Sequence, residues 1–263
     1  MSITNTNWLY FTGALLLLLF APLSTSWAEP YVYRVLLAGP LVFVPWAAIL
    51  FPKLKSELPK QITTLYFINV LLLIAAFCLP AGLLATAMSG TWLLFTIYLL
   101  AAILRKSAQQ NLGILIALCS LPVAAAWIVA DRLGFQPLGF DPLIVLLTGV
   151  HFHYAGFALA IMAAHLPNNP LNRWLNFGMI AGLAGVAAGI TSTQLDGPAW
   201  IEILGVSIMV TVGIGIAIQQ LRYAWRSKRS LLAQLLLSLG ALALIAGMVL
   251  ALLYGWRFHY QWS

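Results

Sequence analysis

Two histidines lie two positions apart inside a long apolar stretch of the chain. His151 and His153 belong to the string Thr148-Gly-Val-His-Phe-His-Tyr154. If this stretch forms a helix that starts at Pro142, the imidazoles lie about 14 to 17 Å along it, close to the middle of a bilayer. An ionisable side chain at that depth is costly and usually faces a protein interior or a wet cavity. The two histidines are therefore candidates for acid–base chemistry.

A regular helix turns these two imidazoles to opposite sides, because residues two apart are separated by about 200°. His151 then shares its face with Thr148 and Tyr154, and His153 shares its face with Gly149. One imidazole can serve a site while the other bonds a neighbouring helix, or the helix can be unwound here. The alternative is that both are neutral, hydrogen-bonded pegs between helices.

A second group of polar residues lies in the turn between two later apolar stretches. It extends from Thr191 to Glu202 and includes Gln194 and Asp196. A carboxylate just inside the membrane, such as Glu202, can pair with a histidine, accept a proton or bind a cation. Its alternative role is an interfacial charge stabilised by the dipole of the helix that follows.

The predicted site combines both groups. The predicted catalytic residues are His151, His153, Glu202 and Asp196, and the predicted substrate-binding residues are Thr148, Tyr154, Asp141 and Gln194. Asp141 also precedes Pro142 and is expected to cap the helix that begins there. Imidazole and carboxylate together can hold zinc or iron, but no His-x-x-His or His-Glu-x-x-His spacing is present, so no metal or other cofactor is assigned.

The composition places these residues in a membrane protein. Apolar residues make up 62% of the 263 residues and charged residues only 7%, against about 25% charged in a soluble domain. We predict an all-α fold, a polytopic transmembrane helical bundle with about nine spans, forming one domain over residues 1–263. The formal charge of +7 reflects basic residues at helix ends rather than nucleic-acid binding. Cys78 and Cys119 are interpreted as small core residues without a disulfide.

Apolar stretches separated by short polar segments give the expected spans. They are Trp8 to Trp27, Val35 to Phe51, Ile62 to Leu79, Leu83 to Leu104, Leu112 to Ala130, Pro142 to Leu166, Trp174 to Leu195, Trp200 to Tyr223 and Leu231 to Tyr254. The first could be a signal peptide, but the segment before it contains no Lys or Arg, which favours a retained helix.

The basic residues predict the orientation of the chain. Of the thirteen Lys and Arg residues, ten fall on one side of the predicted membrane and three, Arg34, Arg132 and Arg257, on the other. The positive-inside rule then places the N-terminus in the cytoplasm and the C-terminus outside. Asp131 lies beside Arg132, and both are interpreted as interfacial charges. The expected location is the cell inner (cytoplasmic) membrane, with multiple passes.

Small residues and prolines mark special points in the spans. Glycines recur along the stretch from Trp174 to Leu195, which predicts close packing against another helix. They are Gly178, Gly182, Gly185 and Gly189. Prolines within other stretches are expected to kink their helices and to free backbone carbonyl groups. They are Pro40, Pro45 and Pro122.

The string from His151 to Phe157, His-Phe-His-Tyr-Ala-Gly-Phe, resembles the signature of the YndJ-like membrane proteins. This bacterial family is sometimes labelled as transporters. The resemblance implies a bacterial cytoplasmic-membrane protein with the histidines near its functional centre, and it extends over the spans around them, including the segment with Glu202. It implies no particular substrate.

Three functions fit these observations. The first is a membrane-embedded enzyme acting on a lipophilic small molecule from the outer leaflet, with a histidine and Glu202 as acid and base. The second is a small-molecule or proton-coupled transporter, although no inverted repeat is visible. The third is a non-catalytic assembly subunit, for which the glycine face and aromatic helix ends suffice. Membrane lipid is the expected partner in each case.

Overall fold

The chain is folded into membrane-length helices. The computed structural model describes residues 14, 30–51, 58–106, 111–226 and 230–260, and the regular structure in these residues is helical throughout. Seven helical segments of this described part are long and apolar enough to cross a membrane, and the shorter apolar helix Ile62–Cys78 lies at another expected span. Because a bilayer offers the backbone no hydrogen bonds, helices that bond within themselves are the stable solution. The predicted all-α transmembrane bundle is confirmed.

The observed helices match the expected spans closely. The largest differences are at helix ends, where observed helices extend a few residues past the apolar stretch, as in Trp200–Arg226 against the expected end at Tyr223. Polar residues can continue a helix beyond the hydrocarbon because water or headgroups meet them there. The expected first span, Trp8 to Trp27, falls outside the described residues apart from Ala14.

The helices form two compact units, and each is described by itself. The first comprises Met1–Gln110 and Ala117–Ala158, and the second comprises Asn111–Ile116 and Leu159–Ser263. The predicted single domain over residues 1–263 concerns both units together and stays a prediction.

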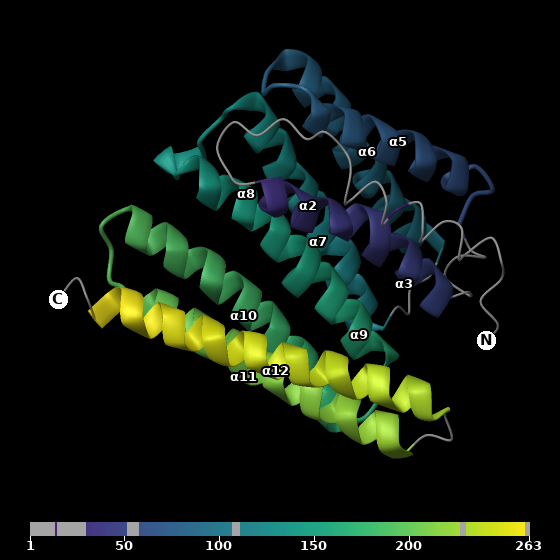
Figure 1. Ribbon diagram of the computed structural model, residues 1–263, viewed down its shortest axis with the longest axis vertical. Coiled ribbons are helices and arrows are strands. Elements are labelled where there is room, and N and C mark those ends of the chain that lie inside the picture. Colours follow the sequence, from purple (N-terminus) through teal and green to yellow (C-terminus); the bar gives the residue numbers. More distant parts are fainter. Residues whose placement is uncertain (1–13, 15–29, 52–57, 107–110, 227–229, 261–263) are drawn as a thin grey trace. The chain divides into compact units, whose positions relative to one another are not determined.

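The first unit begins with one continuous helical segment made of α2 (Pro30–Ala38), η1 (Gly39–Phe43) and α3 (Val44–Leu50). It continues with α5 (Ile62–Cys78) and α6 (Leu83–Lys106), which pack side by side as a hairpin (Figure 1). The remaining elements are most of α7 (Leu112–Leu133), followed by α8 (Pro142–His151) and η3 (Phe152–Ala158).

Two segments of the first unit, η1 and η3, are π-helices rather than α-helices. A π-helix is wider than an α-helix by one residue per hydrogen-bonded ring, and it occurs mostly as single turns, often at functional sites. The expected kink at Pro40 takes this form, because Pro40 lacks an N–H group and lies at the start of η1. The histidine string does not unwind; its helix changes from α to π after His151.

The second unit is built mainly from three long helices. After α9 (Leu159–His165), it contains α10 (Pro170–Gln194), α11 (Trp200–Arg226) and α12 (Leu231–Tyr260). The side chain of Asn169 caps α10 by accepting a hydrogen bond from the backbone N–H of Asn172 at 2.9 Å, and Pro170 occupies the first turn. This is the usual chemistry of a helix start, and it fixes where the long apolar helix begins.

Glycines bring α10 and α11 into close contact. A Cβ atom at Gly182 would lie 3.0 Å from the sulfur of Met209, and one at Gly185 would lie 2.9 Å from the Cα of Gly205. Real Cβ contacts are essentially never that short against backbone, so Gly185 is required for this approach. The predicted packing role of the glycine stripe is confirmed.

The cysteines differ from the expected core residues. Both are free, but the side chain of Cys119 is exposed on α7 and that of Cys78 is half-buried. The interpretation of Cys119 as a core residue is therefore wrong. A thiol is apolar enough to face lipid, so an apolar helix gives no signal of which way such a residue points.

Candidate functional site

His153 lies on η3 with a fully buried side chain. Its Nδ1 atom is 2.8 Å from the carbonyl oxygen of Gly149. A carbonyl oxygen only accepts hydrogen bonds, so we assign the proton of the neutral ring to Nδ1. Its Nε2 atom is buried and has no hydrogen-bond partner among the described residues. The ring is therefore held by one nitrogen and presents a free lone pair at the other.

The backbone of η1 covers this imidazole. A Cβ atom at Gly39 would lie 2.7 Å from both Cγ and Cδ2 of His153, so only glycine permits the contact. On another side of η3, a Cβ at Gly156 would lie 2.6 Å from Ser120 on α7. Two glycines thus let the neighbouring segments approach the π-helical turn that carries His153.

His151 is the last residue of α8 and is half-buried. Its Nε2 atom is also buried and lacks a partner among the described residues, and its ring stands edge-on to Phe152 at a centroid distance of 5.8 Å. The change from α- to π-helix falls between the two histidines, so the 200° separation expected for a regular helix does not apply. Neither Nε2 forms the interhelical hydrogen bond that a structural peg requires, as far as the described residues show.

Three polar residues predicted to bind substrate are engaged with the backbone of the first unit. Thr148 donates from Oγ1 to the carbonyl of Ile144 at 2.7 Å. Tyr154 donates from its hydroxyl to the carbonyl of Val35 in α2 at 3.0 Å. Asp141 accepts a hydrogen bond from the backbone N–H of Leu143 at 2.8 Å. This bond confirms the expected role of Asp141 as a helix cap. Their role in substrate binding stays a prediction.

The acidic residues of the predicted site belong to the second unit. Glu202 lies in the first turn of α11, where one carboxylate oxygen accepts a hydrogen bond from Thr193 at 2.8 Å. Asp196 and Gln194 are exposed in and beside the turn before it, and Asp196 adopts a left-handed conformation with φ of 57°. The histidines belong to the first unit, so the predicted pairing of Glu202 with them stays a prediction.

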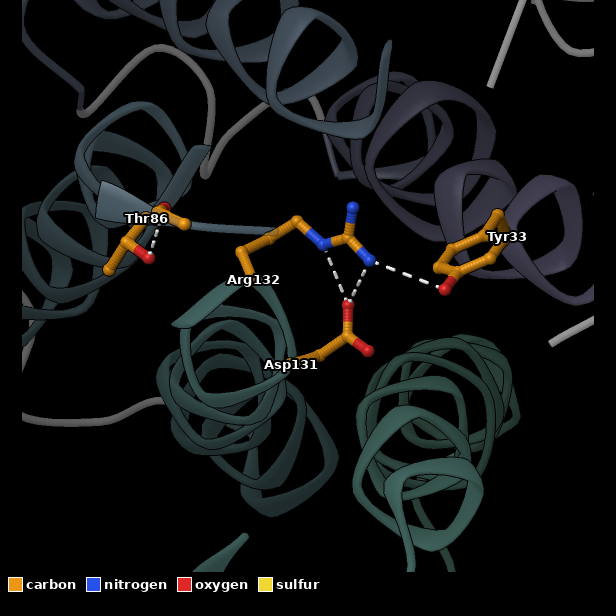
Figure 2. A network of polar contacts seen from close by, with 5 residues as sticks. Tyr33, Thr86, Asp131 and Arg132 are labelled. Carbon is orange, nitrogen blue, oxygen red and sulfur yellow. Dashed lines mark hydrogen bonds and ion pairs between the residues drawn. The ribbon is translucent and has the colours of Figure 1, made fainter. Parts of the chain in front are cut away.

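A charged pair that sequence analysis interpreted as interfacial is buried in the first unit. Arg132 is 0% exposed and Asp131 is 3% exposed, so that interpretation is wrong. Nε and Nη2 of Arg132 each lie 2.7 Å from Oδ2 of Asp131, and Nη2 also donates to the hydroxyl of Tyr33 at 3.3 Å, as Figure 2 shows. The pair joins the end of α7 to the start of α2.

Aromatic rings complete the surroundings of Arg132. Its guanidinium carbon lies 5.1 Å from the ring centroid of Tyr33 and 4.6 Å from that of Phe77, distances at which a cation is attracted to a ring face. The carbonyl of Arg132 accepts from the N–H of Gly82 in the turn between α5 and α6 at 2.8 Å. Arg132 therefore fastens together four elements of one corner of the unit. Adjacent charges at a helix end predict no burial, so the sequence carried no signal for this corner.

Two polar atoms of this pair remain without partners among the described residues. They are Nη1 of Arg132 and Oδ1 of Asp131. Asp131 also lines a small hollow of about 10 Å³, which is close to the space that one water molecule needs. Its other lining residues are Gly134, Phe135, Gln136, Pro142 and Val145. Within the described part of the chain, no three His, Cys, Asp or Glu side chains gather in a way that could hold a metal ion.

The model of the family described as YndJ-like protein matches residues 34–258, which is most of the chain. The chain belongs to the YndJ-like family. This match agrees with the resemblance of the histidine string, and it shows that the protein is an integral membrane protein of that family.

This YndJ-like protein is similar to a Bacillus subtilis (strain 168) protein named "Uncharacterized membrane protein YndJ". The two are 29% identical over 128 residues, which cover 44% of this chain and 22% of the relative. The matched segment thus spans about a fifth of the length of that relative. No solved structure matches the chain significantly.

Proposed function

We propose that this protein is a membrane-embedded enzyme of the cytoplasmic membrane that performs acid–base chemistry on a lipophilic small molecule at His153. The observation that supports this most is the buried Nε2 of His153, which has no hydrogen-bond partner in the part of the chain that the structure describes. A neutral imidazole is the side chain best suited to accept a proton near physiological pH. The Nδ1 bond to Gly149 holds the ring and its tautomer, so the lone pair at Nε2 is presented in a fixed direction.

Within the proposed site, each residue has a separate role. His153 is the proton acceptor, and His151, whose Nε2 is also buried and has no partner among the described residues, is a second proton carrier two residues away. Tyr154 is proposed to contact the substrate, and its bond to Val35 ties the π-helical segment η3, to which it belongs, to α2. Glu202 and Asp196 belong to the second unit, and their predicted catalytic role stays a prediction. The substrate is proposed to be lipophilic because a buried site within membrane-spanning helices is reached through lipid.

The proposal is tested with purified protein in vesicles made from a total lipid extract of a bacterial cytoplasmic membrane. Mass spectrometry of the lipids before and after incubation is expected to show one lipid class consumed and one product formed. The variant His153→Asn keeps an N–H that can donate to Gly149 but removes Nε2. We expect it to lower the turnover at least about a hundredfold, the typical contribution of a general base.

The matched control is His165→Asn, which removes an imidazole from the end of α9, where it stands edge-on to Tyr223. This control is expected to keep the turnover of the wild type. A pH-sensitive dye inside the vesicles measures proton movement in the same samples. Proton uptake without any lipid conversion would indicate a transporter instead of an enzyme. Equal turnover in wild type and His153→Asn would contradict the proposed site.

A further inference from the structure

His153 has no exposed surface, yet an imidazole that acts on a substrate must be reached. Within the first unit, one segment that lies directly on the ring is η1, through the backbone of Gly39. A Cβ atom added to Gly39 would lie 2.7 to 2.8 Å from three atoms of the His153 side chain. Access to this face of the imidazole therefore requires that η1 move away.

The construction of η1 and α3 makes such a movement possible. η1 is a π-helix, and Pro40 and Pro45 both lack the N–H group that would bond to the preceding turn. Helices bend at prolines and π-helical turns, because the backbone hydrogen-bond ladder is interrupted there. α3 is also loosely packed, since Trp46 is 52% exposed and Ala47 is its buried residue.

The two ends of this segment differ in how firmly they are held. On α2, Tyr33 and Leu36 are 0% exposed and Leu37 is 2% exposed, and the bond from Arg132 to Tyr33 fastens the start of the helix. Past the π-helical turn, the side chains of α3 are mostly half-buried. The more deeply buried end is therefore α2, and the less buried end is α3.

One hydroxyl group fastens the bend between these ends. The hydroxyl of Tyr66 on α5 donates to the carbonyl oxygen of Pro40 at 2.8 Å. Tyr66 is itself buried against Trp92 and Phe95, with ring centroids at 6.3 and 6.1 Å. The donor is thus rigidly placed, and it bonds the residue next to the glycine that covers His153.

We propose that η1 and α3 form a hinged cover over His153, anchored through α2 by Arg132 and held closed by the Tyr66 hydroxyl on the Pro40 carbonyl. The cover controls access of the lipophilic substrate to Nε2 of His153. This inference rests on the proposed function for its purpose, but the opening of the cover can be measured without any substrate.

The test uses diethyl pyrocarbonate, which acylates unprotonated imidazole nitrogens, on the full-length protein in detergent. Mass spectrometry of peptides then gives the rate of modification of each histidine. Wild-type His153 is expected to react slowly, at a rate set by the opening of the cover. Tyr66→Phe removes one hydrogen bond that exists only in the closed state, so the rate is expected to rise about threefold to tenfold. His165 serves as the internal reference and keeps its rate.

The matched control is Thr86→Val. Thr86 donates from Oγ1 to the carbonyl of Gly82, also at 2.8 Å, in the same unit, and Figure 2 draws this bond at Thr86 as a dashed line. This variant also loses a hydroxyl that bonds a backbone carbonyl, and it is expected to leave the rate at His153 within about twofold of wild type. An equal rise in the modification rate of His153 in Tyr66→Phe and Thr86→Val would contradict the proposed cover. So would the absence of any reaction of His153 in both wild type and Tyr66→Phe.

A second variant acts in the opposite direction and remains informative if Tyr66→Phe folds poorly. Pro45→Ala restores a backbone N–H within the segment, which stiffens it, so the modification of His153 is expected to slow about threefold. A rate equal to or faster than wild type would contradict the hinge. If these rates behave as expected while His153→Asn keeps lipid turnover, the proposed function fails and the cover stands.

Discussion

Two regions of the molecule bring backbones together through glycine, and they use the contact differently. Between α10 and α11, Gly182 lies against Met209 and Gly185 against Gly205, and both helices are regular over their full lengths. Between η1 and η3, Gly39 lies against the ring of His153, and both segments are π-helical.

The difference lies in what fills the space that glycine leaves. In the α10–α11 hairpin it is filled by backbone and by an apolar side chain, which is the usual way that membrane helices associate. In the π-helical pair it is filled by an imidazole with an unpartnered nitrogen. Close approach alone therefore indicates packing, whereas close approach combined with an irregular backbone and a free polar atom indicates a site with another purpose.

The strongest way to break the π-helical region is to remove its anchor. Asp131→Ala leaves the guanidinium of Arg132 buried without its carboxylate, and we expect a loss of about 3 to 5 kcal/mol in the free energy of unfolding. Thermal or denaturant unfolding of the protein in detergent measures the loss. Asp196→Asn is the control in the hairpin region, because Asp196 is exposed and asparagine tolerates its left-handed backbone, and it is expected to leave the unfolding transition nearly unchanged. Equal stability of both variants would show that the buried pair is not an anchor.

The comparison is sharpened by adding the same methyl group to both glycine contacts. Gly39→Ala and Gly185→Ala each force a Cβ atom to within 3 Å of a neighbour, and each is expected to cost about 1 to 3 kcal/mol of stability. Only Gly39→Ala pushes against His153, so only this variant should speed the modification of His153 by diethyl pyrocarbonate. Faster modification in Gly185→Ala as well would mean that general loosening, not the cover, exposes the imidazole.

The fold could be predicted from the sequence further than the site could. Long apolar stretches have one stable solution in lipid, so the helices and their approximate limits follow from composition alone. The glycine stripe of α10 could be predicted for the same reason, because small residues at helical spacing have a single common use in membranes. The helix cap at Asp141 follows from local chemistry and was also foreseen.

The features that the sequence did not indicate depend on contacts between distant segments. The π-helical segment of residues 152–158 brings Gly156 against Ser120 and His153 against Gly39, and no local pattern encodes these contacts. The burial of Arg132 depends on Tyr33 and Phe77, which lie far away in the sequence. A charged pair at a helix end looks the same in the sequence whether lipid headgroups or aromatic rings surround it.

In the proposed site, His153 is a neutral ring with its proton on Nδ1 and a lone pair on Nε2 that has no partner among the described residues. Nitrogen-15 NMR of histidine-labelled protein in lipid, with His153→Asn to assign the signals, tests this directly. We expect a protonated, pyrrole-type signal for Nδ1 and an unprotonated, pyridine-type signal for Nε2 of His153 at neutral pH. A protonated Nε2 with an unprotonated Nδ1, or protons on both nitrogens, would contradict it.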